Sequence, residues 1–198
     1  SLKDSGLGKL FVSAMQKPAI VDFEPYEPSN GAFSSFIGAP VVSNGETIGV
    51  IALQMPTEVI NAIVQRRDGM GKTGENYLVG KLGGKNSLRS DRTVKSGKIG
   101  DSKSDELIDK AFNGESGFEL KAGSTGDVEV TQFSPLKLNG LDWVLMGTAS
   151  LEELLAGSEA KKGEDFFADF VKINGYYDLF LIGSDGYIFY SVGQEADY

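Results

Sequence analysis

The sequence predicts an α+β fold with two small modules, each an antiparallel sheet flanked by helices and connected to the other by a helix. Glycine supplies 26 of the 198 residues, about twice the usual share, and many of these glycines lie in dipeptides typical of hairpin turns. The segments beside these turns are rich in Val, Ile, Phe and Tyr, which favour strands. Short segments between the hairpins carry apolar residues at helical spacing.

The predicted strands form hairpins whose turns are marked by glycine-containing dipeptides. Asn-Gly and Asp-Gly turns join three pairs of strands: residues 32–42 with 47–55, 128–138 with 141–149, and 177–183 with 187–192. Weaker turns join two more pairs: residues 76–81 with 87–90, and 117–122 with 127–133. We expect the last hairpin to join the strands of residues 20–55 in one sheet group, because no later segment offers it a partner. The strands of residues 76–149 form the other group.

Helices are predicted where the chain crosses between strands, at residues 4–16, 56–67, 104–113, 151–156 and 164–173. Pro56 suits the first turn of the second helix, and Gly114 ends the third. Ser150 begins a capping box for the fourth helix. In the last helix three phenylalanines share one stripe, which is typical of side chains packed in a core.

Composition excludes several classes of function. The chain carries 19 Lys and Arg residues against 28 Asp and Glu residues, and its net charge of −9 argues against a nucleic-acid partner, which needs clustered cations. It contains neither cysteine nor histidine, which excludes disulfides, thiolate metal sites and the commonest general base. We therefore expect no metal, no cofactor and no enzyme activity. No apolar run reaches the roughly 18 residues that a membrane helix needs, so we expect a soluble chain without membrane insertion.

Two glycine-rich segments share features with ligand loops but are better explained as turns. The segment Gly71-Lys72-Thr73 has the end of a phosphate-binding P-loop, but Arg66 stands where the first glycine is required, and a helix precedes it. The turn at residues 183–186 is followed by apolar residues rather than calcium ligands. Acidic pairs at 152–153 and 164–165 lie at helix starts, where negative charge is favoured, so capping explains them better than glycoside hydrolysis.

Several segments, in a consistent spacing over nearly the whole chain, resemble one family of sensor domains. They are Asp22-Phe23-Glu24-Pro25-Tyr26-Glu27-Pro28-Ser29, Ile37-Gly38-Ala39-Pro40-Val41, residues 48–55, residues 69–80, Leu88-Arg89-Ser90-Asp91, Ser134-Pro135-Leu136 and Leu141-Asp142-Trp143-Val144-Leu145. On these residues the chain resembles the double-Cache family of PAS-like, extracytoplasmic sensor domains of bacterial chemoreceptors, sensor histidine kinases and cyclases. The resemblance implies two Cache modules that bind a small molecule, without catalysis, in the extracytoplasmic part of a membrane receptor.

The order of the segments departs from that family. In double-Cache domains a segment like residues 166–198 comes first, whereas here it comes last, so the chain resembles a circular permutant. The resemblance assigns residues 1–55 plus 164–198 to the membrane-distal module, and residues 56–155 to the connecting helix and the membrane-proximal module. Residues 156–163 then form a linker between the original ends. We interpret the chain as an engineered permutant, usable as a biosensor with a reporter at its new ends; a natural tandem array cut out of frame is the alternative.

The resemblance places the ligand in the membrane-distal module. Tyr26 matches the tyrosine of the family's Pro-Tyr pocket motif and offers an aromatic wall and a hydroxyl. Strand alternation puts Ser34, Phe36 and Gly38 on one face, which we expect to line the pocket. Plain core packing is the alternative for Phe36 and Ser34. Tyr190, on the C-terminal hairpin, is a further candidate for ligand contact.

Gln54 lies where, by the resemblance, amino-acid-binding members carry an aspartate that holds the ammonium group of the ligand. A neutral amide cannot supply that charge, and the first helix lacks the Arg, Trp and Tyr of the amino-acid motif. We therefore expect a small polar organic ligand, such as a carboxylate, a polyol or an amine, rather than an ordinary α-amino acid. We also expect a monomer, because the dimerising helix of the family is shortened here to residues 164–173. A structural or signal-transmitting module without a ligand, and an enzyme that uses carboxylates and tyrosines alone, are the alternatives.

Overall fold

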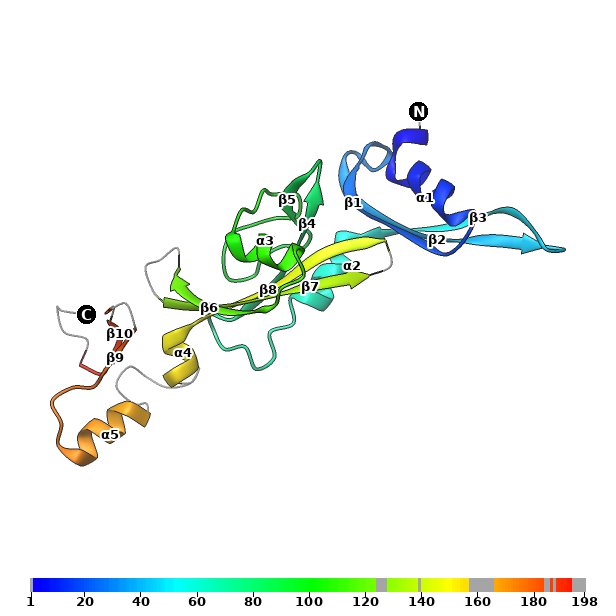
Figure 1. Ribbon diagram of the computed structural model, residues 1–198. Helices are drawn as coiled ribbons and strands as arrows, with labels where there is room; N and C mark the ends of the chain where they lie inside the picture. The colour runs from blue at the N-terminus through cyan, green and yellow to red at the C-terminus, as the bar shows by residue number, and fades with distance from the viewer. Residues whose placement is uncertain are drawn as a thin grey trace. The chain divides into compact units, whose positions relative to one another are not determined.

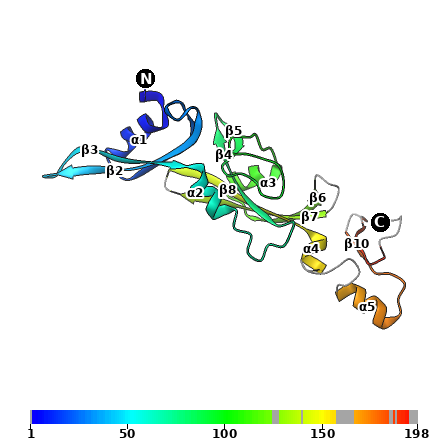
Figure 2. The same cartoon turned by 180° about the vertical axis from the view of Figure 1, so that it is seen from behind.

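The computed structural model describes residues 2–123, 128–138, 140–156, 166–183, 186 and 188–193 (Figure 1, Figure 2). The chain divides into two compact units. Unit 1 contains Ser1–Arg66, Asn76–Gly117 and Phe133–Met146, and unit 2 contains Arg67–Glu75, Phe118–Gln132 and Gly147–Tyr198. None of the described helices is long and apolar enough to cross a membrane.

Unit 1 begins with a helix packed on a three-stranded antiparallel sheet (Figure 1). The elements in chain order are η1 (Leu2–Asp4), α1 (Gly6–Ala14), β1 (Ala19–Tyr26), η2 (Glu27–Ser29), β2 (Ala32–Ser43) and β3 (Glu46–Pro56), where η marks a short 3-10 helix. The strands lie in the order β1-β2-β3. Leu10 and Ala14 of α1 are fully buried against Tyr26 and Phe36, and these side chains form the core of the N-terminal sheet.

The turn between β2 and β3 shows how the local sequence determines this hairpin. Asn44 and Gly45 have φ angles of 51° and 83°, the left-handed pair that a two-residue turn of type I′ requires. Glycine adopts that conformation at low cost because it lacks a Cβ atom, and asparagine tolerates it because its short polar side chain can hydrogen-bond locally. The predicted pairing of residues 32–42 with 47–55 is confirmed by a register in which Ser43 faces Glu46.

A five-stranded sheet follows α2 (Thr57–Val64), and its strands lie in the order β5-β4-β8-β7-β6. Their bounds are β4 (Glu75–Leu82), β5 (Lys85–Leu88), β6 (Gly117–Ala122), β7 (Val128–Leu138) and β8 (Leu141–Ser150). The neighbours in this order confirm the predicted pairings of β4 with β5, β6 with β7, and β7 with β8. The turn residues 124–127 and Asn139 lie outside the described residues.

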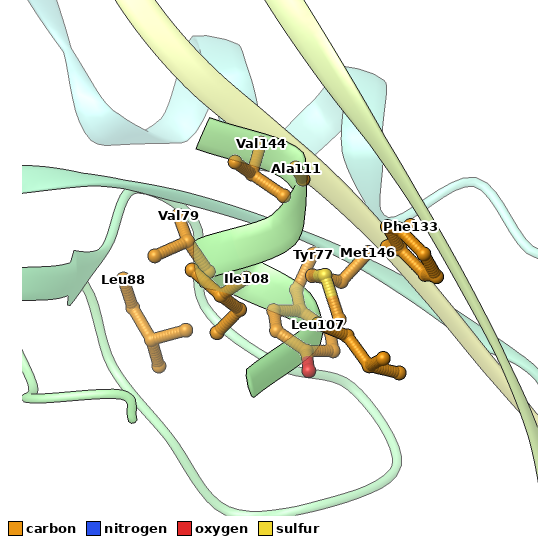
Figure 3. Packing of buried hydrophobic residues seen from close by; sticks show 9 residues of the cluster. All are labelled: Tyr77, Val79, Leu88, Leu107, Ile108, Ala111, Phe133, Val144 and Met146. Carbon is orange, nitrogen blue, oxygen red and sulfur yellow. The ribbon is translucent and has the colours of Figure 1, made fainter. Parts of the chain in front are cut away.

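Helix α3 (Glu106–Phe112) covers the part of this sheet that belongs to unit 1. Asp105 caps the helix, because its carboxylate accepts the N–H of Leu107 at 3.0 Å. The helix packs its apolar face on side chains of the sheet, as Figure 3 shows. The buried cluster consists of Tyr77, Val79, Leu88, Leu107, Ile108, Ala111, Phe133, Val144 and Met146.

An ion pair between a fully buried arginine and a partly exposed aspartate joins the two sheets within unit 1. Asp22 of β1 accepts Arg89 Nε at 2.9 Å and Trp143 Nε1 at 3.0 Å. The Arg89 side chain is fully buried, and Gly80 leaves room for it, since a Cβ atom there would lie 2.9 Å from both Arg89 Nε and Trp143 Cδ1. The rings of Phe23 and Trp143 stack with centroids 6.3 Å apart. Polar and apolar contacts therefore hold the sheets at one place.

Unit 2 contains the C-terminal elements α4 (Leu151–Ala156), α5 (Phe166–Asn174), β9 (Phe180–Ile182) and β10 (Ile188–Ser191). Asp178 closes the β9–β10 hairpin: its carboxylate accepts the N–H groups of Leu179 at 2.6 Å and Gly193 at 2.9 Å, and the Ser191 hydroxyl at 2.7 Å. Burial raises the pKa of Asp178, but these hydrogen bonds outweigh burial and hold the pKa below its usual value.

One sequence-based expectation for unit 2 is wrong, and another stays a prediction. The last hairpin pairs β9 with β10, and its predicted pairing with the N-terminal strands stays a prediction. A turn dipeptide specifies the two strands that it connects and not the sheet that they extend. The phenylalanine stripe of α5 is predicted to be core, but Phe166 is 72% exposed and Phe170 is 41% exposed. Phe167 packs on Tyr190, with ring centroids 5.3 Å apart.

The division into modules stays a prediction. Residues 157–165, which contain most of the predicted linker at 156–163 and the predicted start of the last helix, lie outside the described residues. Ala156 is described as the last residue of α4. The predicted helices at residues 4–16, 56–67, 104–113 and 151–156 are confirmed with ends that shift by a few residues or fewer.

Candidate functional site

A hollow of about 700 Å³ lies in unit 1 beside the end of β1. Its walls come from the start of α1, the last residues of β1, η2 and Leu82 of β4. Three of its residues differ in chemistry: Lys9 supplies an ammonium group, Glu24 a carboxylate and Tyr26 an aromatic ring with a hydroxyl. The hollow thus has polar groups of both charges beside an aromatic side chain, a combination suited to small polar molecules.

Lys9 and Glu24, which both line the hollow, form an ion pair. Lys9 Nζ lies 3.0 Å from Glu24 Oε1 and 2.7 Å from Oε2, which joins α1 to β1. The side chains are 54% and 24% exposed. A pair this open to solvent contributes at most about 1 kcal/mol to stability. Both charged groups can therefore turn toward a ligand at little cost to the fold.

Tyr26 lies between the hollow and the core of the N-terminal sheet. Its side chain is 7% exposed, and its ring meets the Phe36 ring edge-on with centroids 4.9 Å apart. Ser34, Phe36 and Gly38 are all buried, as strand alternation predicts for one covered face. Helix α1 is what covers this face, because a Cβ atom at Gly38 would lie 2.9 Å from Leu10 Cδ2. Phe36 is therefore a core residue of α1 and the sheet.

Gln54 connects the sheet to η2. Its Nε2 group donates to Ser29 Oγ at 3.0 Å and to Ser34 Oγ at 2.9 Å, and Ser34 Oγ in turn donates to the Ala32 carbonyl at 3.3 Å. Both amide hydrogens of Gln54 are used in these contacts, so its Oε1 atom is the group that can accept a further hydrogen bond.

The structure brings four of the five predicted site residues into one region of unit 1: Tyr26, Ser34, Phe36 and Gln54. The fifth, Tyr190, belongs to unit 2, where it is buried in β10 against Phe167.

Sequence reasoning missed Lys9 and Glu24. Their spacing of 15 residues crosses a helix, a loop and part of a strand, and no local pattern predicts such a pairing. The available signal was a lysine on the exposed face of the first helix and a glutamate inside the Asp22–Ser29 segment. Among the described residues no group of three or more acidic side chains could hold a metal ion.

Replacement of Phe36 tests its place in the core. We expect Phe36→Ala to lower the free energy of unfolding by about 3–5 kcal/mol, because it leaves a cavity among fully buried side chains. Phe118→Ala is the matched control, since Phe118 is 73% exposed, and we expect it to change stability by less than about 0.5 kcal/mol. Urea unfolding measures both values. A Phe36→Ala variant as stable as Phe118→Ala would show that Phe36 does not support the fold.

No family model and no curated protein matches the chain. Among solved structures, it is similar to the ligand-binding domain of the Pseudomonas fluorescens chemoreceptor CtaA in complex with L-isoleucine, with 13% identity, a TM-score of 0.50, and coverage of 76% of this chain and 60% of that one. It is also similar to the extracellular domain of mmHK1S-Z2, a protein assigned as a histidine kinase, with 21% identity, a TM-score of 0.50, and coverage of 75% of this chain and 57% of that one. The chain thus spans less than two thirds of the length of these domains. The predicted α+β class, with antiparallel sheets and flanking helices, is confirmed, and its fold is like that of receptor sensor domains.

Proposed function

We propose that the chain is a small-molecule-binding sensor domain from the extracytoplasmic part of a bacterial signal-transduction receptor, either a chemoreceptor or a histidine kinase. The observation that carries this proposal is the hollow beside β1, where Lys9, Glu24 and Tyr26 present a cation, a carboxylate and an aromatic ring together. The similarity in fold to sensor domains of such receptors supports it. Binding would then act through a shift between two arrangements of the unit, each favoured by a different ligand state.

The charges of the hollow favour a small polar organic ligand. Lys9 Nζ suits a carboxylate, and the Glu24 carboxylate suits an amine or the hydroxyls of a polyol. The similar CtaA domain was solved with L-isoleucine, but Gln54 carries no charge for an α-ammonium group, and its two amide hydrogens are engaged by Ser29 and Ser34. We therefore place α-amino acids behind other carboxylates and amines.

The predicted site residues have different roles in this proposal. Tyr26 lines the hollow and contacts the ligand through its phenol group. Gln54 does not line the hollow, so its contact with the ligand through Oε1 rests on the sequence resemblance. Ser34 and Phe36 position these two residues, because Ser34 Oγ accepts from Gln54 and the Phe36 ring fixes the Tyr26 ring. Tyr190 contacts the ligand only if the C-terminal hairpin belongs to the ligand-binding module, as the order of segments in the resembled family implies.

A specific observation favours the alternative, a structural or signal-transmitting module without its own ligand. Phe36 is 2% exposed and Tyr26 is 7% exposed, and α1 fills the face that sequence alternation assigned to a pocket. In this alternative Tyr26, Phe36 and Gln54 act in packing alone.

A thermal-melt screen distinguishes the two functions. The panel contains carboxylates, amines, polyols, amino acids and divalent cations. A ligand present at about a hundredfold excess over its Kd adds about 2.7 kcal/mol to the free energy of unfolding, which raises Tm by roughly 5–11 °C. We expect a hit whose Tm shift falls in Tyr26→Phe, which removes only the hydroxyl, and in Gln54→Ala. Tyr176→Phe, at a 60% exposed tyrosine of unit 2, is the control and should keep the shift.

The other outcomes of the screen contradict parts of the proposal. A hit that neither variant weakens would move the site away from Tyr26 and Gln54. A panel without any Tm shift would contradict ligand binding and support the module without a ligand.

We further propose that the chain is a monomeric, engineered circular permutant whose native order starts near residue 164. The support is the order of the segments that resemble the double-Cache family, with Gly157-Ser158 as a joining sequence. A chain that starts at residue 164 and joins Tyr198 directly to Ser1 should fold and keep the melting hit, whereas a control opened at Asn44-Gly45 should melt lower, because that cut breaks the β2–β3 hairpin. Failure of the first variant to fold would contradict the permutation. Sedimentation at twice the 21.2 kDa chain mass would contradict the monomer.

A further inference from the structure

We propose that the loop of residues 69–74, between α2 and β4, is a carboxylate receptor, and that Glu153 of α4 is its internal ligand. In this arrangement the carboxylate holds α4 to the loop as a latch that acid or a competing carboxylate can release. We call residues 69–74 the receptor loop. The loop and α4 both belong to unit 2, and the inference does not depend on the proposed ligand-binding function.

The receptor loop donates hydrogen bonds to both oxygens of the Glu153 carboxylate. The N–H of Lys72 donates to Oε1 at 2.6 Å, and the N–H of Thr73 donates to Oε2 at 2.7 Å. The Thr73 hydroxyl also donates to Oε2. Two adjacent backbone N–H groups and a hydroxyl thus converge on one carboxylate, which is the arrangement of an anion-binding nest. Hydrogen bonds to a charged acceptor are about twice as strong as those to a neutral one.

Gly71 provides the space that the carboxylate occupies. A Cβ atom at Gly71 would lie 2.5 Å from Glu153 Oε1 and 2.7 Å from Cδ, so only glycine admits the bound carboxylate. Gly69 in the same loop offers a comparison: its φ of +77° resembles the +64° of Gly71, but a Cβ atom there would have no neighbour within 4 Å. Gly71 therefore meets two requirements, a positive φ angle and space for the carboxylate, whereas Gly69 meets only the first.

Other contacts prepare the loop for its ligand. Arg67 donates to the carbonyls of Gly71 at 3.0 Å, Lys72 at 2.5 Å and Gly74 at 2.8 Å, which directs the loop carbonyls away from the carboxylate. The Thr73 hydroxyl oxygen also accepts the N–H of Ser150 at 3.0 Å, which ties the start of α4 to the same residue. The backbone and the Thr73 side chain of the receptor loop therefore connect the loop with α4 and with the residue that precedes it.

The latch has an opening through which a small anion can compete. A hollow of about 390 Å³ lies beside the carboxylate. It is lined by four residues of the receptor loop, which do not include the donors Lys72 and Thr73, and by Ala149, Glu153 and Leu154. The receptor recognises a carboxylate through two N–H groups and a hydroxyl, so a small monocarboxylate such as acetate matches the same donors once Glu153 is removed.

Protonation of Glu153 opens the latch. Burial raises the pKa of this carboxyl, but the hydrogen bonds from the N–H of Lys72 and from Thr73, with the positive charge of Lys72, outweigh burial and lower the pKa. Lys72 on the receptor loop is the charged group that acts on this carboxyl; Arg67, which precedes the loop, contacts the loop carbonyls, and Glu152 is the adjacent residue of α4. Because the folded-state pKa is below the unfolded value, the stabilisation is present above the unfolded pKa and is lost as pH falls through the folded pKa.

Hydrogen exchange at the amides of Lys72 and Thr73, monitored by NMR, measures directly whether their hydrogen bonds to Glu153 are formed. We expect Glu153→Gln to speed exchange at both amides by at least about tenfold relative to Glu152→Gln, because hydrogen bonds to a charged acceptor are lost. Glu152→Gln removes the same charge from the adjacent position of α4. Acetate should restore protection in Glu153→Ala. Equal exchange in the two Gln variants, or no effect of acetate, would overturn the proposal.

A comparison of alanine substitutions at Gly71 and Gly69 distinguishes loss of space for the carboxylate from backbone strain. Ala at either position adds strain at positive φ, but only Gly71→Ala displaces the carboxylate. We expect Gly71→Ala to speed exchange at Thr73 more than Gly69→Ala does, and this difference should vanish in a Glu153→Ala background. A difference that persists without Glu153 would contradict the role of Gly71.

The wild-type chain supplies a test that needs no variant to fold. The amide shifts of Lys72 and Thr73 should titrate together with a midpoint below the usual Glu range, because both N–H groups report protonation of the same carboxylate. Amide shifts that stay constant through the acid range would overturn the latch.

Discussion

The arrangement of unit 1 depends on the carboxylate of Asp22. It sits on β1 and accepts hydrogen bonds from a fully buried guanidinium, Arg89, and from the indole of Trp143. A buried arginine without its partner would be an uncompensated charge in a low-dielectric site. The same strand carries Glu24 and Tyr26 of the hollow, so the residue that joins the two sheets also fixes the strand that presents the candidate site.

Carboxylates serve this chain where other proteins use disulfides or metal ions. The chain contains no cysteine and no histidine, and three acids connect backbone and side-chain groups from different parts of the chain. Asp22 joins two sheets, Asp178 closes the C-terminal hairpin, and Glu153 holds the receptor loop. Each of them accepts several N–H or O–H groups, and for Asp178 and Glu153 these hydrogen bonds lower the pKa of the acid. The acidic composition therefore reflects internal connections as well as a solvated surface.

Local signals in the sequence were sufficient for the hairpins and most helices, but long-range contacts were not accessible from it. Asn44-Gly45 specifies its turn because the left-handed backbone is a property of those two residues. The Lys9–Glu24 and Asp22–Arg89 pairs depend on which elements meet in space, and no residue pattern encodes that meeting. Alternation placed Phe36 on a covered face correctly, yet it could not say that α1 rather than a ligand covers it. The prediction that the phenylalanines of α5 lie in a core was wrong for the same reason, because an apolar stripe indicates a packing partner without identifying it.

The most direct test of this account is the coupling energy between Asp22 and Arg89. Trp143 is the only tryptophan of the chain, so its fluorescence follows urea unfolding at the joint itself. We predict that Asp22→Asn and Arg89→Met each lower the free energy of unfolding by about 3–5 kcal/mol, and that the double variant reveals a coupling of about 1.5–3 kcal/mol. Strictly additive effects, within about 0.5 kcal/mol, would contradict the claim that this ion pair joins the sheets.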